Sequence, residues 1–185
     1  MRKKFFKMKG IIGIIMLLTT LTTFGQLSNL KLKNVVVIGQ FDKNEDRYTI
    51  ESTMTSILKD FNIPSTPSVN YVKTGQSTQV LLSDSVQAIL KEKGFDTYVV
   101  VSVRGYDRKY NVSTQRLTLK EKLEQGTIRE IYRNAAVSVT FEFAFYRNGE
   151  LVAIDHVKCS NISDRESTLK RFVNNVQKRI LKKWR

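Results

Sequence analysis

The densest run of β-favouring residues lies between residues 95 and 103, where a tyrosine and four valines are interrupted by a single serine. A strand that is covered on both faces has such a continuous apolar run, whereas a half-exposed strand alternates apolar and polar residues. Residues 83–94 predict a helix directly before it, with Ser83 or Asp84 as the cap and Gly94 as the stop. A helix, a glycine and a buried central strand in this order predict an α/β fold.

A second buried strand is predicted over residues 35–39, and an amphipathic helix follows it. Asn44 or Asp46 is the expected cap of this helix. Residues 65–68 then predict a turn or loop, and residues 69–72 a short edge strand. The apolar residues that recur at helical spacing along one face of the helix are Ile50, Met54, Ile57, Leu58 and Phe61.

The clearest alternation lies in residues 137–145, where valine or phenylalanine occupies every second position. This pattern predicts a strand with one strongly apolar face. Asn148 and Gly149 fit the two positive-φ positions of a type I′ turn, so residues 151–154 begin the return strand of a β-hairpin.

The end of the chain predicts a final amphipathic helix. Ser163 and Glu166 match a capping box. All these elements together predict one α/β domain over residues 35–185, bordering on α+β, with a mixed sheet around a central buried strand, a C-terminal β-hairpin and a terminal helix. The apolar stripe with which that helix should cover the sheet is Leu169, Phe172, Val173, Val176, Ile180 and Trp184.

The first residues predict export. Five cationic residues and no acid lie in residues 1–10, a short apolar run follows, and small residues stand near Gly25. This order is typical of a signal peptide over residues 1–25, followed here by a polar segment over residues 26–34. The alternative is an uncleaved membrane anchor, although a spanning helix usually needs about 20 apolar residues. Lipid anchoring is not expected because the only cysteine, Cys159, is far from the cut. We therefore expect the protein in the periplasm or cell envelope of a bacterium, without a transmembrane span after cleavage.

The basic charge is concentrated in the last helix. The full chain has a net charge of +14, and residues 165–185 contain eight Lys or Arg against one acid. The cationic side could bind anionic lipid, teichoic acid, lipopolysaccharide phosphates or an acidic protein. The alternative is a solvated face that complements the helix dipole. The candidate binding residues there are Lys178, Arg179, Lys182 and Lys183.

The segment from residue 104 to residue 133 mixes tyrosines with basic residues. Such a mixture is typical of a ligand or nucleic-acid surface, and predicted export argues against nucleic acid. The alternative is a solvated hairpin or loop whose tyrosines pack on the sheet edge, or strands around residues 116–119 and 128–131. The candidate binding residues of this segment are Tyr106, Arg108 and Tyr110.

Two carboxylates are the one plausible acid–base centre. If the hairpin turn sets the register, Glu142 lies directly opposite Asp155, and Phe141 lies opposite His156. Like charges that face each other in a ladder are unfavourable unless a cation or a shared proton lies between them. Such a pair could serve a metal or a hydrolase-type reaction. The alternatives are a different register, or a Lys or Arg that contacts both carboxylates.

The remaining reactive side chains predict no catalytic or metal site. His156 is the only histidine, and we expect it to pack at the edge of the aromatic face. Cys159 is three residues further along the strand, so the two side chains point to opposite faces and make poor co-ligands. We expect Cys159 to be buried and inert, and no cofactor or metal is expected.

A resemblance to known proteins rests on the residues Val35–Gly39, Arg47, Glu51, Leu90–Val101 and Asn148-Gly149. With these residues, the order of elements resembles small bacterial envelope proteins, many of them lipoproteins, and the α/β domain at the amino terminus of the Tol-system protein TolB. The chain departs from this group by lacking the lipid-attachment cysteine and a tryptophan near the end of the return strand. The resemblance implies an envelope protein without catalytic residues.

These observations favour an exported, non-enzymatic envelope protein that acts as an adaptor or accessory binding subunit. The first alternative is a module that binds an anionic surface through the basic C-terminal helix. The second is a hydrolase-type enzyme that uses Glu142 and Asp155. The expected partner is an envelope protein or an anionic envelope surface, and the oligomeric state stays open.

Overall fold

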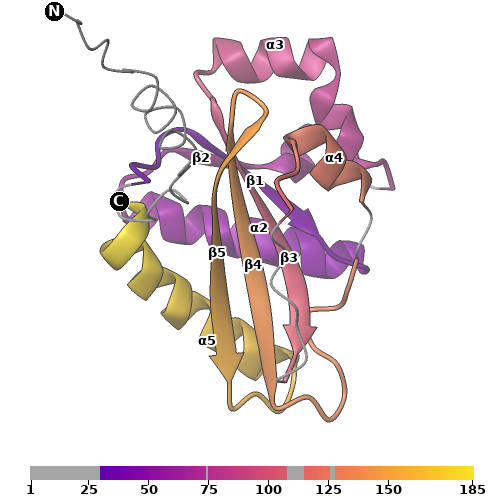
Figure 1. The fold of residues 1–185 in the computed structure, drawn as a ribbon, viewed down its shortest axis with the longest axis vertical. Helices are drawn as coiled ribbons and strands as arrows, with labels where there is room; N and C mark the ends of the chain where they lie inside the picture. Colours follow the sequence, from indigo (N-terminus) through magenta and orange to yellow (C-terminus); the bar gives the residue numbers. More distant parts are fainter. Residues whose placement is uncertain (1–29, 74, 108–114, 126–127) are drawn as a thin grey trace, which may run out of the picture.

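The computed structural model describes residues 30–73, 75–107, 115–125 and 128–185. They form a single mixed α/β domain with a five-stranded sheet in the order β2-β1-β3-β4-β5 (Figure 1). The strands are β1 (Val35–Gln40), β2 (Ser65–Pro67), β3 (Thr97–Tyr106), β4 (Ser138–Arg147) and β5 (Glu150–Ser160). The helices are α2 (Asn44–Asp60), α3 (Asp84–Glu92), α4 (Leu119–Glu124) and α5 (Arg165–Arg179), and α5 continues into a π-helical turn, η3 (Ile180–Trp184).

The central strand of the sheet is β3, as predicted. It is parallel to β1 and antiparallel to β4, and Val99, Val100 and Val101 are fully buried. One apolar layer packs α2 and α5 against one face of the sheet, and a second, smaller layer packs α3 and α4 against the other. The predicted helix before β3 is confirmed, and Gly94 ends it with a positive φ of 76°.

The cap of α2 differs from the prediction. Lys43 occupies the N-cap position, and neither Asn44 nor Asp46 caps the helix. The Asp46 carboxylate instead accepts hydrogen bonds from Arg165 Nε at 2.9 Å and from the Ile131 backbone N–H at 3.3 Å. The Asp46 side chain, which the sequence predicted as a possible helix cap, therefore makes tertiary contacts instead.

The edge strand beside β1 also differs from the prediction. It covers residues 65–67, which were predicted to be a loop, and residues 68–70 form a 3₁₀ turn in place of a strand. The turn places the Ser68 hydroxyl 2.6 Å and the Val69 N–H 2.9 Å from the two carboxylate oxygens of Glu51. This buried acceptor explains why the chain leaves the sheet here.

No strand forms at residues 116–119 or 128–131 within the described part of the chain. Leu119 begins α4, and Thr118 and Glu121 form a capping box at the N-terminus of this helix. Arg129 makes one isolated bridge to Phe41. The alternative that strands form at these two positions is therefore wrong.

The hairpin turn has the predicted form, but the register of the hairpin does not. Asn148 and Gly149 have φ values of 51° and 80°, which fit a type I′ turn. Tyr146 pairs with Leu151, but Phe145 pairs with Ala153, so Val152 is an extra residue in β5. This β-bulge moves every later pair by one residue.

The terminal helix packs as predicted and begins one residue later than predicted. The capping box consists of Asp164 and Ser167, not of Ser163 and Glu166. Trp184 is fully buried, and its ring centroid lies 4.9 Å from that of Phe143 and 5.1 Å from that of Phe145. Within the described residues, no helix is long and apolar enough to cross a membrane.

Candidate binding site at the end of the sheet

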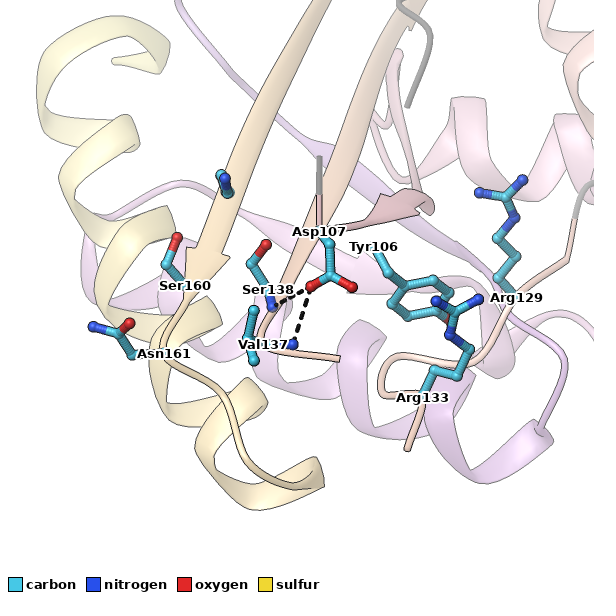
Figure 2. Close-up of a pocket in the computed structure, with 9 residues that line it drawn as sticks. Tyr106, Asp107, Arg129, Arg133, Val137, Ser138, Ser160 and Asn161 are labelled. Atoms are coloured by element: carbon cyan, nitrogen blue, oxygen red, sulfur yellow. Dashed lines mark hydrogen bonds between the residues drawn. The ribbon is translucent and has the colours of Figure 1, made fainter. Parts of the chain in front are cut away.

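An open hollow of about 790 Å³ lies where β3 ends and β4 begins (Figure 2). Figure 2 shows Asp107 in its middle, with Tyr106, Arg129 and Arg133 on one side and Ser160 and Asn161 on the other. Side chains from β3, β4, β5 and the segment around residues 129–133 line it. We call it the sheet-end hollow; its lining is completed by Val137, Ser138 and Lys158.

The Asp107 carboxylate is held in place by the backbone. Asp107 leaves β3 with a positive φ of 56°, and its Oδ1 accepts hydrogen bonds from Val137 N–H at 3.0 Å and Ser138 N–H at 3.1 Å. The Asp107 N–H donates in turn to the Ser138 carbonyl at 2.8 Å. This acid therefore fastens the start of β4 to the end of β3.

Three cations border the hollow. The Arg133 guanidinium lies 4.7 Å from the centre of the Tyr106 ring, a cation–π contact. Arg129 Nη1 donates to the Arg104 carbonyl at 2.6 Å, and Lys158 is exposed on β5. Among the described residues, Arg129, Arg133 and Lys158 form no ion pair. Their positive charge is therefore available to a ligand.

The Tyr106 hydroxyl donates its hydrogen bond within the protein and not to a ligand. It donates to the Glu130 carbonyl at 2.6 Å, and burial, assisted by the negative charge of Glu130, raises its pKa. The ring supports Arg133, and the phenol is neutral near pH 7. Of the predicted surface, Tyr106 thus belongs to a hollow, whereas Arg108 and Tyr110 lie outside the described residues.

The basic residues of the last helix lie at a different place. Lys178, Arg179 and Lys182 line a groove of about 260 Å³ between α5 and β5, and Lys158 borders this groove as well as the sheet-end hollow. Lys183 does not line it. The structure therefore does not combine the two predicted surfaces into one site.

Arg179 has a structural task that the sequence did not indicate. Its Nη2 donates to the His156 carbonyl at 3.1 Å, and Asn175 Nδ2 donates to the Lys158 carbonyl at 3.0 Å. The His156 N–H donates to Asp155 Oδ1 at 2.8 Å. Because β5 is the last strand of the sheet, these bonds occupy backbone groups that an edge strand otherwise offers to another chain.

The predicted carboxylate pair does not exist. The β-bulge at Val152 sets Glu142 opposite His156 and sets Asp155 opposite Phe143, so the two carboxylates lie on opposite faces of the sheet. Asp155 accepts from Trp184 Nε1 at 3.0 Å and lies 3.7 Å from Arg179. The alternative of a different register is therefore the one observed, and among the described residues no Lys or Arg contacts both carboxylates.

Glu142 is instead the buried acceptor of a cationic cluster. Its side chain is 3% exposed, with Lys122 Nζ at 2.6 Å, His156 Nε2 at 3.3 Å and Arg104 Nε at 3.7 Å. Burial alone would raise the pKa of Glu142, but the His156 hydrogen bond, the charge and hydrogen bond of Lys122 and the charge of Arg104 lower it to about 2. The carboxylate is therefore ionised throughout the neutral range.

His156 and Cys159 point to opposite faces, as predicted, but the environment of His156 differs. His156 faces Glu142 and does not pack on the phenylalanine face. Cys159 is fully buried on that face, and burial raises the pKa of its thiol to about 12. Within the described residues, no group of three or more His, Cys, Asp or Glu side chains could hold a metal ion.

The structure contains a further buried carboxylate, Glu51, whose burial the sequence did not predict. It is fully buried, and its Oε1 accepts from the Gly39 N–H at 2.8 Å, Arg47 Nε at 3.0 Å and the Ser68 hydroxyl at 2.6 Å. Arg47 and Glu51 were named only among the residues that carry the resemblance, and their i,i+4 spacing was the physical signal for the ion pair. Glu51 thereby satisfies backbone donors at the carboxyl ends of β1 and β2, the place where α/β folds often bind ligands.

The fold and the hollow together define a small α/β domain with an open hollow that is bordered by cations at one end of the sheet. Searches against models of protein families and against curated proteins gave no match. Among solved structures, the chain is similar to the crystal structure of lipoprotein GNA1162 from Neisseria meningitidis, with a TM-score of 0.41 and 10% sequence identity. The similarity covers 83% of this chain and 98% of that chain, and a likeness so distant assigns no function.

Proposed function

We propose that this chain is an exported, non-enzymatic accessory protein of the bacterial cell envelope that binds a protein partner at the sheet-end hollow. The observation that carries the proposal is the charge of the hollow. Arg129, Arg133 and Lys158 border it, while its one carboxylate, Asp107, already accepts two backbone hydrogen bonds. A partner surface that carries carboxylates would complement these cations and be steered toward them.

An exposed apolar side chain supports a protein partner over a small anion. Val137 is 65% exposed and borders the same hollow. Protein interfaces combine an apolar centre with a polar, charged rim. A segment of a partner that presents one apolar side chain between acidic residues would match both features.

The non-enzymatic part of the proposal is supported by the surroundings of Glu142. A general acid or base works best when its pKa lies near the operating pH, and the pKa of Glu142 is about 2. Its contacts with Lys122 and Arg104 are those of a structural anion. The envelope location rests on the basic and apolar pattern of residues 1–25.

The test is site-specific photo-crosslinking of the full chain in living cells. A photoreactive amino acid replaces Val137, and a matched probe replaces Ile89, which is 43% exposed on α3. We expect one dominant protein adduct from position 137 and none from position 89. Substitution Lys158→Glu should weaken that adduct strongly, because it reverses a cation at the rim. Equal adducts from both positions, or no adduct from position 137, would contradict the proposal.

A further inference from the structure

The first described residues and the end of the chain form one pole of the domain (Figure 1). The Leu30 N–H donates to the Lys183 carbonyl at 3.4 Å, and the Leu32 N–H donates to the Trp184 carbonyl at 3.1 Å. Arg147 Nη2 donates to the Leu30 carbonyl at 2.5 Å. Two basic segments that are far apart in the sequence are thereby fixed side by side.

This pole is strongly cationic. Lys31, Lys33 and Lys182 are exposed, Lys183 is half-buried, and residues 30–34 and 180–185 contain no Asp or Glu. Among the described residues, none of these four lysines has an ion pair. Leu181 is 62% exposed between them. We call these five residues the lysine pole.

The lysine pole is also where the chain leaves the predicted signal segment. The expected cut lies before Gln26, and the five residue steps from Gly25 to Leu30 span at most about 18 Å of extended chain. A signal segment over residues 1–25, as the sequence predicts, would hold the lysine pole within this distance of the membrane until cleavage. Lysines close to an anionic lipid surface are attracted to it, and an apolar side chain can enter the headgroup layer.

We propose that the lysine pole docks the domain on a membrane surface that contains anionic phospholipids. The ammonium groups of the four lysines contact headgroup phosphates, and Leu181 enters the interfacial layer. Arg179 does not take part because it binds the His156 carbonyl and Asp155. The sequence predicted a basic surface on the last helix alone. In the structure, Lys31 and Lys33 lie beside the end of this helix and extend that surface.

This docking is independent of the protein partner proposed above, and it orients the hollow. Arg147, at one end of β4, donates to the Lys31 carbonyl of the lysine pole at 3.2 Å, whereas Ser138, at the other end, lines the sheet-end hollow. A ten-residue strand spans about 33 Å. A domain docked through the lysine pole therefore presents the sheet-end hollow away from the membrane, toward a partner.

The test is sedimentation of the full chain with lipid vesicles. Vesicles of phosphatidylcholine alone are compared with vesicles that also contain phosphatidylglycerol, at low and at high salt. We expect anionic vesicles to bind at least about tenfold more protein at low salt, and the excess to disappear at high salt because charge contacts are screened. Binding to the neutral vesicles measures the contribution of the apolar segment in residues 11–18.

Matched variants separate the lysine pole from general charge. Lys31→Glu with Lys182→Glu should remove most of the excess binding to anionic vesicles and leave only the part due to the five cations of residues 1–10. Lys91→Glu with Lys120→Glu changes the net charge equally on exposed positions of α3 and α4, and should keep it. Equal losses from both pairs, or equal binding to both kinds of vesicle, would overturn the proposal. Crosslinking at position 137 tests the protein partner separately, so the two proposals can fail independently.

Discussion

Glu142 on β4 faces His156 on β5, and the His156 Nε2 lies 3.3 Å from the Glu142 Oε2. One extra residue, Val152, produces this pairing, because a shift of one residue moves every later side chain of β5 to the other face. Asp155 consequently reaches Trp184 on the face that α5 covers. In a regular hairpin Glu142 and Asp155 would face each other. Here Glu142 binds Lys122 and Arg104, and Asp155 lies close to Arg179.

The Glu142 cluster predicts how stability depends on pH. The pKa of Glu142 is lowered from 4.5 to about 2 in the folded protein, so the carboxylate stabilises the fold fully above pH 4.5 and loses this contribution as the pH falls toward 2. Glu142→Gln should lower the free energy of unfolding by about 2–3 kcal/mol at pH 7. The difference from the wild type should shrink across that interval, as measured by urea unfolding. Glu92→Gln, on the exposed end of α3, is the control; a deficit of Glu142→Gln that did not change with pH would contradict the assignment.

The bulge predicts that one deletion in β5 is tolerated and another is not. Removing Val152 joins the pair Tyr146–Leu151 directly to the pair Phe145–Ala153 and leaves every other pair unchanged. We therefore expect a small change in Tm. Removing the exposed Lys158 instead forces part of β5 onto the wrong face, and Tm should fall by more than about 10 °C. Thermal unfolding by circular dichroism measures both, and equal effects would contradict the register.

The side chains of Asn175 and Arg179 occupy backbone carbonyls on the outer edge of β5, and we predict that they hinder self-association. Asn175→Ala combined with Arg179→Ala frees the carbonyls of Lys158 and His156, and an exposed edge strand pairs readily with other chains. We expect concentration-dependent oligomers by size-exclusion chromatography with light scattering. Asn174→Ala, on an exposed neighbouring position of α5, should stay like the wild type. Unchanged behaviour of the double variant would show that the edge is protected in another way.

The buried Glu51 predicts a large loss of stability on truncation. Glu51→Ala leaves the Gly39 N–H, the Ser68 hydroxyl and the Arg47 guanidinium without their acceptor. We expect the free energy of unfolding to fall by about 3–5 kcal/mol. Glu45→Ala in the same helix removes an exposed contact with Arg165 and should cost less than about 1 kcal/mol. Urea titrations compare the two, and similar losses would mean that the Glu51 network is not the cause.

The elements themselves were largely predictable because local patterns specify them. The valine run of β3, the alternation in β4, the turn at Asn148-Gly149 and the stripe that ends at Trp184 all appear where periodicity and turn chemistry placed them. Each pattern lies within one element, and burial of an apolar face is the force that it reports.

The candidate site was predictable only in part. Tyr106 was identified from its basic and aromatic neighbours. Lys158 lies on the return strand of the hairpin and was not a candidate, and Arg129 and Arg133 lie in the segment 104–133 but were not among its candidate residues. These residues meet because β3 and β5 end where β4 begins. Asp107, which fastens two of those ends, carried no local signal at all.

The sequence by itself thus determined most of the helices and strands and which of their faces are apolar, because these properties depend on neighbours within one turn or two residues. It did not determine the structure of residues 65–72 or 116–131. The tertiary structure decided which polar side chains became caps, ion pairs or site residues. Asp46 was predicted to cap its helix but binds Arg165, and Glu142 was predicted to face Asp155 but faces His156. The reason is that a buried charge takes whichever partner the fold brings within hydrogen-bond distance, and that partner is set by the register and packing of elements far apart in the chain.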